Sequence, residues 1–232
     1  MNRVVIDDVS VLEQAFTAEF AARAAGSIAR RGKFVVGLPG GSVATMFLPV
    51  LAAQSVDWRR IDLLWIDERA VPPDHPDSNY GIASRLLLSP ARVPGPSIHR
   101  MYGELPDLEQ AARRASDDVK SIAGDPPRID LALVGVGADG HVASVFPGGV
   151  GISASSPVVA VYDAPKPPSR RLTMTLSVLA DAGIVVVAAF GASKMVAMRG
   201  ALDESDKTSP VAQLLRRASS SLVLLDREAG QK

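Results

Sequence analysis

The chain has 232 residues, 47% of them hydrophobic, which is enough to bury a sizeable core without disulfides or metals. Its 25 Lys and Arg residues balance 25 Asp and Glu residues, and this zero net charge argues against a nucleic-acid or membrane-surface partner. The lack of cysteine excludes thiolate metal sites and a cysteine nucleophile. We see no signal-peptide core and no apolar run of membrane-spanning length, so we expect a cytoplasmic protein.

In chain order, helix-spaced apolar residues predict a helix over residues 11–31 that ends at Gly32. Apolar runs then predict strands, and helical patterns alternate with them. The predicted strands cover residues 33–38, 61–66, 129–136, 184–190 and 221–225, and the helices 43–53, 79–88, 107–123 and 193–202. Residues 158–162 and 171–176 are expected in a peripheral sheet, and the tail after Asp226 is expected to fray.

Continuous β-branched runs that alternate with helices are typical of a parallel sheet covered on both faces. The expected fold is therefore α/β: a Rossmann-like three-layer αβα sandwich with a mostly parallel central sheet and a small peripheral β region. No linker or repeat divides residues 1–232, so we expect one domain. Ligands of such sheets bind in the loops beyond the carboxyl ends of the strands, and the loops of interest here follow strands.

The first loop, GLPGGS at 37–42, lies at a strand-to-helix turn, where glycine amides and the helix dipole suit a phosphate; a simple tight turn capped by Ser42 is the alternative. The second places Asp67, Glu68 and Arg69 after a strand, and the planar guanidinium of Arg69 suits a phosphate or carboxylate. A solvated charged turn would look the same.

The third loop, GVGADGH at 135–141, matches the GxGxxG pattern of dinucleotide-binding folds. Too few residues separate it from Pro147 for the helix that such folds need, so we do not expect a nucleotide cofactor. The loop instead presents Asp139 and His141, which suit acid–base chemistry near neutral pH, although a structural histidine remains an alternative.

Two further loops carry cations. Residues 165–171, PKPPSRR, form a rigid basic loop before a strand. Lys194 follows Gly191 at another strand-to-helix turn, where a cation opposes the helix dipole unless an anion is bound; Ser193 as a cap with an outward Lys194 is the alternative. Together the loops favour a small phosphorylated substrate handled by acid–base chemistry.

The same stretches resemble the 6-phosphogluconolactonases, within the group that includes glucosamine-6-phosphate isomerases and deaminases. The matching segments are GLPGGS at 37–42, WIDERAVPPDHPDSNYG at 65–81, LALVGVGADGHVASVFPG at 131–148, PKPPSRRLTMTLSVL at 165–179 and GASK at 191–194. The isomerases carry a glutamate where this chain has Phe146 and a tyrosine where it has Arg69, so the resemblance favours the lactonases. Val142, where lactonases commonly have threonine, departs from the pattern.

The resemblance implies hydrolysis of 6-phospho-D-glucono-1,5-lactone to 6-phospho-D-gluconate in the oxidative pentose phosphate pathway. It implies His141 as the general base and Asp139 as the residue that orients it. Gly40, Gly41, Ser42, Asp67, Arg69, Arg171 and Lys194 are the candidates for substrate and phosphate binding, with Arg171 chosen over Arg170. Asp67 and Glu68 could serve simply to orient Arg69.

No metal or cofactor is expected, and the family suggests a monomer whose partner is a phosphorylated sugar lactone. The three histidines show no metal-ligand spacing. Two alternatives stay open: a glucosamine-6-phosphate isomerase or deaminase, and a non-catalytic sugar-phosphate sensor.

Overall fold

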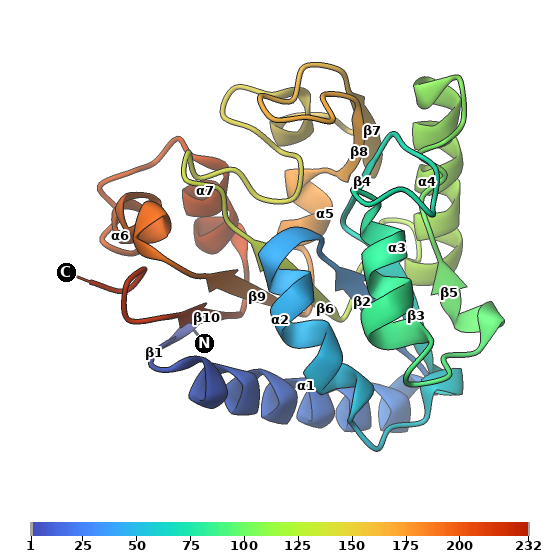
Figure 1. The fold of residues 1–232 in the computed structure, drawn as a ribbon, viewed down its shortest axis with the longest axis horizontal. Helices are drawn as coiled ribbons and strands as arrows, with labels where there is room; N and C mark the ends of the chain where they lie inside the picture. The colour runs from blue at the N-terminus through green and yellow to red at the C-terminus, as the bar shows by residue number, and fades with distance from the viewer. Residues whose placement is uncertain (1, 232) are drawn as a thin grey trace.

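The computed structural model describes residues 2–231, which are built around a seven-stranded parallel sheet (Figure 1). The strands are β1 (Asn2–Ile6), β2 (Phe34–Leu38), β3 (Ile61–Trp65), β5 (Ile98–His99), β6 (Leu131–Gly135), β9 (Ile184–Ala189) and β10 (Ser221–Leu225). Their order across the sheet is β1-β10-β9-β6-β2-β3-β5. A second sheet with antiparallel pairing contains β4 (Asp67–Arg69), β8 (Arg171–Met174) and β7 (Val158–Val161), in that order.

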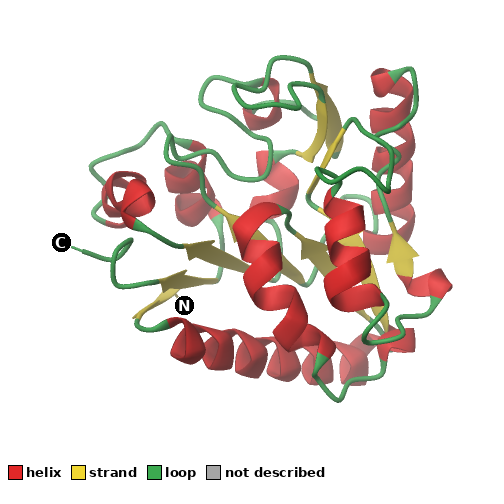
Figure 2. Ribbon diagram, viewed as in Figure 1, coloured by secondary structure: helices red, strands yellow, loops and turns green. Residues whose placement is uncertain are grey.

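Helices cover both faces of the main sheet, as Figure 2 shows by colour. They are α1 (Val9–Arg31), α2 (Gly41–Ala52), α3 (Asn79–Ala83), α4 (Leu108–Ala123), α5 (Leu176–Ala180), α6 (Met195–Leu202) and α7 (Pro210–Arg217). Helices α1, α2 and α3 contact one another in sequence, and α5, α6 and α7 form a second group. The α/β class, the parallel central sheet and the small peripheral sheet are thus confirmed.

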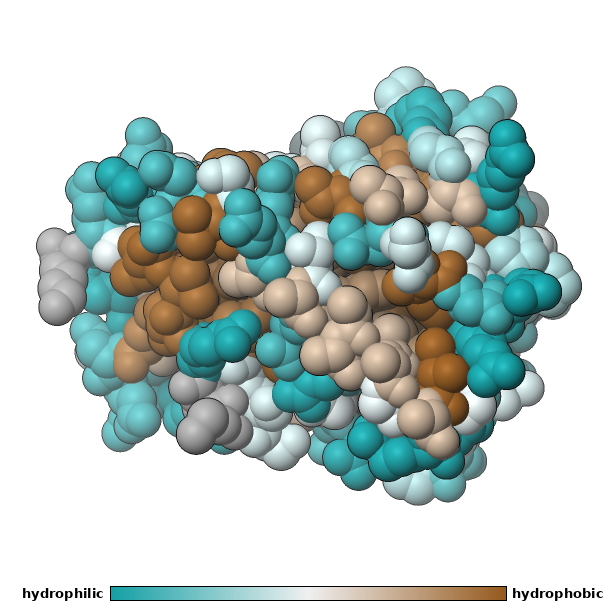
Figure 3. Space-filling model, turned by 90° about the horizontal axis from the view of Figure 1, so that it is seen from below, coloured by the Kyte–Doolittle hydropathy of each residue, from teal (hydrophilic) through white to brown (hydrophobic). Residues whose placement is uncertain are grey.

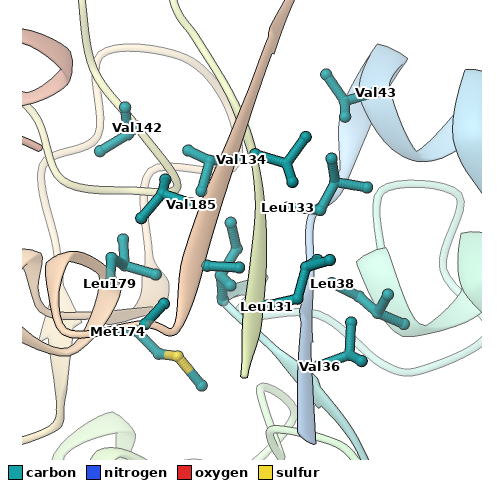
Figure 4. Packing of buried hydrophobic residues seen from close by; sticks show 14 of the residues in the cluster. Val36, Leu38, Val43, Leu131, Leu133, Val134, Val142, Met174, Leu179 and Val185 are labelled. Atoms are coloured by element: carbon teal, nitrogen blue, oxygen red, sulfur yellow. The ribbon is translucent and has the colours of Figure 1, made fainter. Parts of the chain in front are cut away.

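The core explains why the strands are apolar along their whole length. Every residue of β2 and of β9 is buried, because helices lie on both sides of these central strands. Figure 4 shows Leu131 and Leu133 of β6 among side chains that reach Val43 of α2 on one side and Leu179 of α5 on the other. This packing holds the carboxyl ends of the central strands, and the loops that follow them, in place.

Strand β1, at one of the two edges, is the least covered strand of the main sheet. It pairs only with β10, and its Val4 and Ile6 side chains are exposed. Figure 3, viewed from below, shows hydrophobic side chains gathered on the side of the molecule where β1 and α6 lie. Val196 and Leu202 of α6 are also exposed apolar residues.

Some elements differ from the expectations. Residues 67–69, expected as a loop, form β4, and the helix expected over residues 79–88 is α3 followed by a π-helical turn at Ser84–Leu88. The expectation of a frayed tail after Asp226 is wrong for the described residues. Asp226 accepts hydrogen bonds from the N–H groups of Ala229 and Gly230, and Ala229 is buried.

Candidate active site

The site lies where the strand order of the main sheet reverses. From β2 the chain proceeds through β3 and β5 in one direction, whereas β6 is placed on the other side of β2 and is followed outward by β9 and β10. The loops after β2 and β6 therefore diverge, and such a switch point opens a crevice beyond the strand ends. A cleft lies at this point. Residues 40–42 line it from the loop after β2, and Gly135, Val136 and His141 line it from the end of β6 and the loop that follows.

The glycine loop places the amino end of α2 in this cleft. Gly40 precedes the helix, and no side chain caps it. A Cβ at Gly40 would lie 1.8 Å from Oδ1 of Asn79, so only glycine fits beside that buried amide. Gly41 has a φ of +62°, which glycine adopts at little cost. The loop thus turns its backbone, rather than side chains, toward any ligand at the helix end.

The small sheet brings two arginines face to face across the cleft wall. In the β4–β8 pair Asp67 lies opposite Thr173, and Arg69 lies opposite Arg171. Because side chains alternate along a strand, these four residues share one face of the sheet and Glu68 points to the other. Asp67, Arg69 and Arg171 line the cleft. The pairing of β4 with β8 thus brings Asp67, Arg69 and Arg171 to the same wall of the cleft.

Two like charges in direct cross-strand opposition repel each other, and a nearby anion relieves that repulsion. Burial lowers the pKa of Arg171, and the neighbouring charge of Arg69 lowers it further. Arg171 is held by the carbonyl oxygens of Pro168 at 2.8 Å and Lys166 at 2.7 Å. The Nε of Arg69 is buried and has no hydrogen-bond partner among the described residues. The pair therefore suits an anionic ligand such as a phosphate.

Asp67 anchors a buried network between the two sheets. Its carboxylate accepts hydrogen bonds from Ser144 Oγ at 2.8 Å and from Asn79 Nδ2 at 3.0 Å. Ser144 in turn accepts a hydrogen bond from Arg171 Nη1 at 3.4 Å. The Nε of Arg69 lies 4.0 Å from Asp67 Oδ2. Asp67 is thus a long-range ion-pair partner of Arg69, and it reaches Arg171 through the Ser144 hydroxyl.

Glu68 holds the local structure together and does not line the cleft. It faces away from the cleft and accepts hydrogen bonds from the backbone N–H groups of Arg69, Asn79 and Tyr80 and from the Ser78 hydroxyl. Ser78, Asn79 and Tyr80 lie at the amino end of α3, so the carboxylate caps that helix. Burial raises the pKa of Glu68 to about 6, although its hydrogen bonds oppose the change.

His141 and Asp139 form a close pair on the opposite wall. Nδ1 of His141 lies 2.5 Å from Oδ1 of Asp139. An ionised carboxylate only accepts hydrogen bonds, so Nδ1 is the donor, and this leaves the lone pair on Nε2 free to take a proton. The His141 side chain lines the cleft and is 19% exposed. The arrangement fits a general base with an orienting carboxylate.

The surroundings keep the imidazole neutral. Burial lowers the pKa of His141, and Asp139 opposes this shift. Burial acts to raise the pKa of Asp139, but the hydrogen bond and charge of His141 outweigh it, so that pKa is lowered. The ring centroids of His141 and Phe146 are 4.7 Å apart, so an apolar side chain stands beside the imidazole.

Lys194 completes the cationic lining. It ends a 3₁₀ turn, Ala192–Lys194, and directly precedes α6. Burial lowers its pKa, as does the charge of Lys166. The residues at the cap positions of this turn and of α6 are Gly191 and Lys194, so Ser193 is the N-cap of neither. Lys194 lines the same cleft as Arg69 and Arg171.

The structure therefore brings most of the predicted residues to one cleft. Its lining includes Gly40, Gly41, Ser42, Asp67, Arg69, His141, Arg171 and Lys194. Asp139 lies behind His141, and Arg170 stacks near the exposed ring of Tyr162, with 5.7 Å between its guanidinium carbon and the ring centroid. Asn79 and Ser144 lie in the matching segments, but nothing in their local sequence assigns them a role in the site.

The remaining histidines lie elsewhere. His99 pairs with Asp62 at 2.9 Å, and His75 accepts a hydrogen bond from the N–H of Asp77. Over residues 2–231 no group of three or more His, Asp or Glu side chains is arranged to hold a metal ion. Within the same range, no helix has both the length and the apolar character needed to cross a bilayer.

Comparisons with known proteins show the family of this chain. The family model described as glucosamine-6-phosphate isomerases/6-phosphogluconolactonase matches residues 7–224. The 6-phosphogluconolactonase of Mycobacterium tuberculosis is 36% identical over 217 residues, which cover 89% of this chain and 87% of that protein. A probable chloroplastic 6-phosphogluconolactonase of Oryza sativa subsp. indica is 33% identical, and the match covers 83% of this chain but only 63% of that relative.

A solved structure is also similar over nearly the whole chain. The 6-phosphogluconolactonase of Thermotoga maritima superposes with a TM-score of 0.86 at 25% identity. The match covers 97% of this chain and all of that one. The overall fold described above is therefore shared with a solved lactonase structure.

Proposed function

We propose that this chain, which belongs to the family of glucosamine-6-phosphate isomerases and 6-phosphogluconolactonases, hydrolyses 6-phospho-D-glucono-1,5-lactone to 6-phospho-D-gluconate. One observation carries the proposal: the His141–Asp139 pair and the facing guanidinium groups of Arg69 and Arg171 border the same cleft. A base at one wall and an anion site at the other match a substrate with a reactive ester and a phosphate.

The phosphate end of the substrate would bind at the small sheet. Arg69, Arg171 and Lys194 supply positive charge, and the amino end of α2 supplies backbone N–H groups. Asp67 is the carboxylate in the same lining, and it is already engaged by Ser144 and Asn79. Binding energy from this remote phosphate would position the lactone carbonyl beside His141.

At the reacting end, Nε2 of His141 would remove a proton from a water molecule as its oxygen attacks the lactone carbonyl carbon. The carbonyl π bond opens to a tetrahedral oxyanion. When that intermediate collapses, the bond from the carbonyl carbon to the ring oxygen breaks, and the imidazolium returns its proton to the leaving ring oxygen. Asp139 would hold the ring in the required tautomer and stabilise its charged form.

Two residues separate this reaction from isomerisation or deamination of glucosamine 6-phosphate. Phe146, which stands beside the His141 ring, supplies no carboxylate for proton shuttling. Arg69 takes the position where the isomerase pattern has a tyrosine, and it adds a phosphate ligand. A non-catalytic sensor would need the phosphate site but would have no use for the His141–Asp139 pair.

The test generates the lactone in situ with glucose-6-phosphate dehydrogenase and follows its loss against spontaneous hydrolysis. The wild-type protein should accelerate that loss, and His141→Ala should lower kcat by about 10²- to 10⁴-fold. A parallel reaction with glucosamine 6-phosphate should release no ammonia. Near-normal turnover by His141→Ala would refute the assigned base, and ammonia release would favour the isomerase alternative.

The proposal has further parts that the same preparation can test. We propose that residues 1–232 act as one domain and as a cytoplasmic monomer. We also propose that hydrolysis requires neither a cofactor nor a metal ion. Turnover in the presence of EDTA tests whether a metal ion is required. The mass in solution, measured by light scattering, tests whether the protein is a monomer.

A further inference from the structure

A second cavity lies at the opposite end of the main sheet from the candidate active site. It has a volume of about 490 Å³ and is bordered by the last turns of α1, the end of α4 and the amino ends of β2, β6 and β9. Its lining residues are Arg23, Ser27, Arg30, Arg31, Phe34, Ala123, Arg128, Asp130 and Gly183. The size falls within the range of small-molecule sites.

The arginines of this cavity differ in how they are engaged. Arg23 is paired with Glu19 at 2.7 Å, and Arg31 bonds to Asp130 and to the Ser27 hydroxyl. The guanidinium groups of Arg30 and Arg128 make no hydrogen bond or ion pair with the residues that the structure describes. A Cβ at Gly26 would lie 3.3 Å from Nη1 of Arg30, so the absence of a side chain there leaves room for that guanidinium.

The one carboxylate in the lining does not balance these charges. Asp130 serves Arg31 and also accepts a hydrogen bond from the backbone N–H of Val35 at 2.8 Å. Cations near the end of a helix interact favourably with its dipole, which accounts for Arg30 and Arg31 at the end of α1. That explanation does not apply to Arg128, which comes from the segment before β6 and borders the same cavity.

We propose that this cavity binds a small phosphorylated molecule with at least two negative charges, held by Arg30, Arg31 and Arg128. Guanidinium groups bind phosphate oxygens through paired, charge-assisted hydrogen bonds. Ser27 adds a hydroxyl to the same wall. A concave site on a chain with no net charge favours a small ligand over a nucleic acid.

The cavity and the catalytic cleft are separate sites. Strands β2, β6 and β9 begin near the cavity at Phe34, Leu131 and Ile184 and lead to the loops of the cleft at their other ends. A strand of five residues spans roughly 17 Å, so one small ligand cannot occupy both sites. The inference therefore does not depend on the proposed hydrolysis.

Titration with inorganic pyrophosphate, followed by backbone amide NMR and calorimetry at constant ionic strength, tests the proposal. Amide signals of Ala123 and Gly183 should shift in the wild-type protein. Binding at this site should weaken by at least about tenfold in the double variant Arg30→Gln/Arg128→Gln. The control Arg60→Gln/Arg85→Gln removes the same charge from exposed positions outside both cavities and should bind within about twofold of wild type.

Two results would overturn the inference. One is the absence of shifts at Ala123 and Gly183 at millimolar pyrophosphate, and the other is an equal loss of binding in both double variants. Lactone hydrolysis by Arg30→Gln/Arg128→Gln should remain at the wild-type rate and would show that the variant is folded. Failure of the cavity proposal is thereby distinguished from failure of the proposed catalytic function.

Discussion

Gly137 occupies a position where any side chain would displace the His141–Asp139 pair. A Cβ there would lie 2.0 Å from Nδ1 of His141 and 2.5 Å from Oδ1 of Asp139. The backbone N–H of Gly137 also donates to the carbonyl of His141 at 2.9 Å, which closes the loop. The glycine is thus a condition for the hydrogen bond between Asp139 and His141.

We therefore expect Gly137→Ala to lower kcat by about 10- to 100-fold, the loss typical of a disturbed orienting contact. KM should change little, because the arginines lie on another element. Steady-state kinetics with in situ lactone measures both constants. Gly95→Ala is the matched control, since a Cβ at Gly95 would meet no atom within 4 Å. A full-rate Gly137→Ala enzyme would show that the pair is not needed.

The pH dependence of kcat/KM should reflect the burial of His141. Because its pKa is lowered, the imidazole stays neutral below the ordinary value of about 6.5, and kcat/KM should fall only at more acidic pH. In Asp139→Asn the carboxylate that raises this pKa is lost. The acid limb should then move to still lower pH while the plateau of kcat falls about 10- to 100-fold. A limb that stays in place or moves to higher pH would argue against electrostatic coupling of the two residues.

Local spacing was sufficient to suggest that His141 and Asp139 lie together, because they are two residues apart in one loop, and the structure shows them in contact. Ser144 and Asn79 were not assigned roles. Ser144 reaches Asp67 across 77 positions of the sequence, and such a contact exists only once the small sheet has formed. The choice of Arg171 over Arg170 came from the family resemblance, and strand alternation explains why only one of two adjacent arginines lines the cleft.

Among the elements, buried strands were predictable because both of their faces are covered, which makes their sequences continuously apolar. β4 was not, since it is three charged residues whose pairing with β8 depends on the tertiary fold. Helix α7 was overlooked although its signals are present: Ser209 caps its first turn, and Pro210 follows at the first helical position.

Glu68 should make the stability of the β4–α3 region depend on pH. Its pKa is about 6 in the folded chain against 4.5 for an ordinary glutamate. The folded state therefore holds the proton more tightly than the unfolded state. The contribution of Glu68 to stability is fully present below pH 4.5 and is lost as pH rises through 6, by about 2 kcal/mol in total.

Urea unfolding of the wild type and of Glu68→Gln, compared between pH 4.5 and 7.5, measures how much Glu68 contributes to the free energy of unfolding. The stability advantage of the wild type should shrink by about 2 kcal/mol over that range and then level off. Glutamine would also turn an amide donor toward backbone N–H groups, so the variant should be less stable at low pH. A pH-independent difference would mean that Glu68 titrates normally.

At the scale of the whole molecule, the site joins two sheets. The main sheet provides the amino end of α2 and the loop of His141, and the small sheet provides Arg69 and Arg171. Asp67 and Ser144 link the two sides. The sequence could predict that the loops meet at one edge of the sheet. It could not predict that Arg69 lies opposite Arg171, because that depends on the register between β4 and β8.

A ligand that bridges both sheets should stabilise the whole fold. At a concentration of 6-phosphogluconate 100 times its Kd, the folded state gains about 2.7 kcal/mol, which for a chain of this length raises Tm by about 5–10 °C. Differential scanning calorimetry measures the shift.

Gluconate, which lacks the phosphate, should have little effect, and Arg69→Gln should abolish most of the shift because one of the facing guanidinium groups is lost. Arg30→Gln/Arg128→Gln should retain it. Equal shifts from gluconate and 6-phosphogluconate would contradict the assignment of the arginine pair to the phosphate.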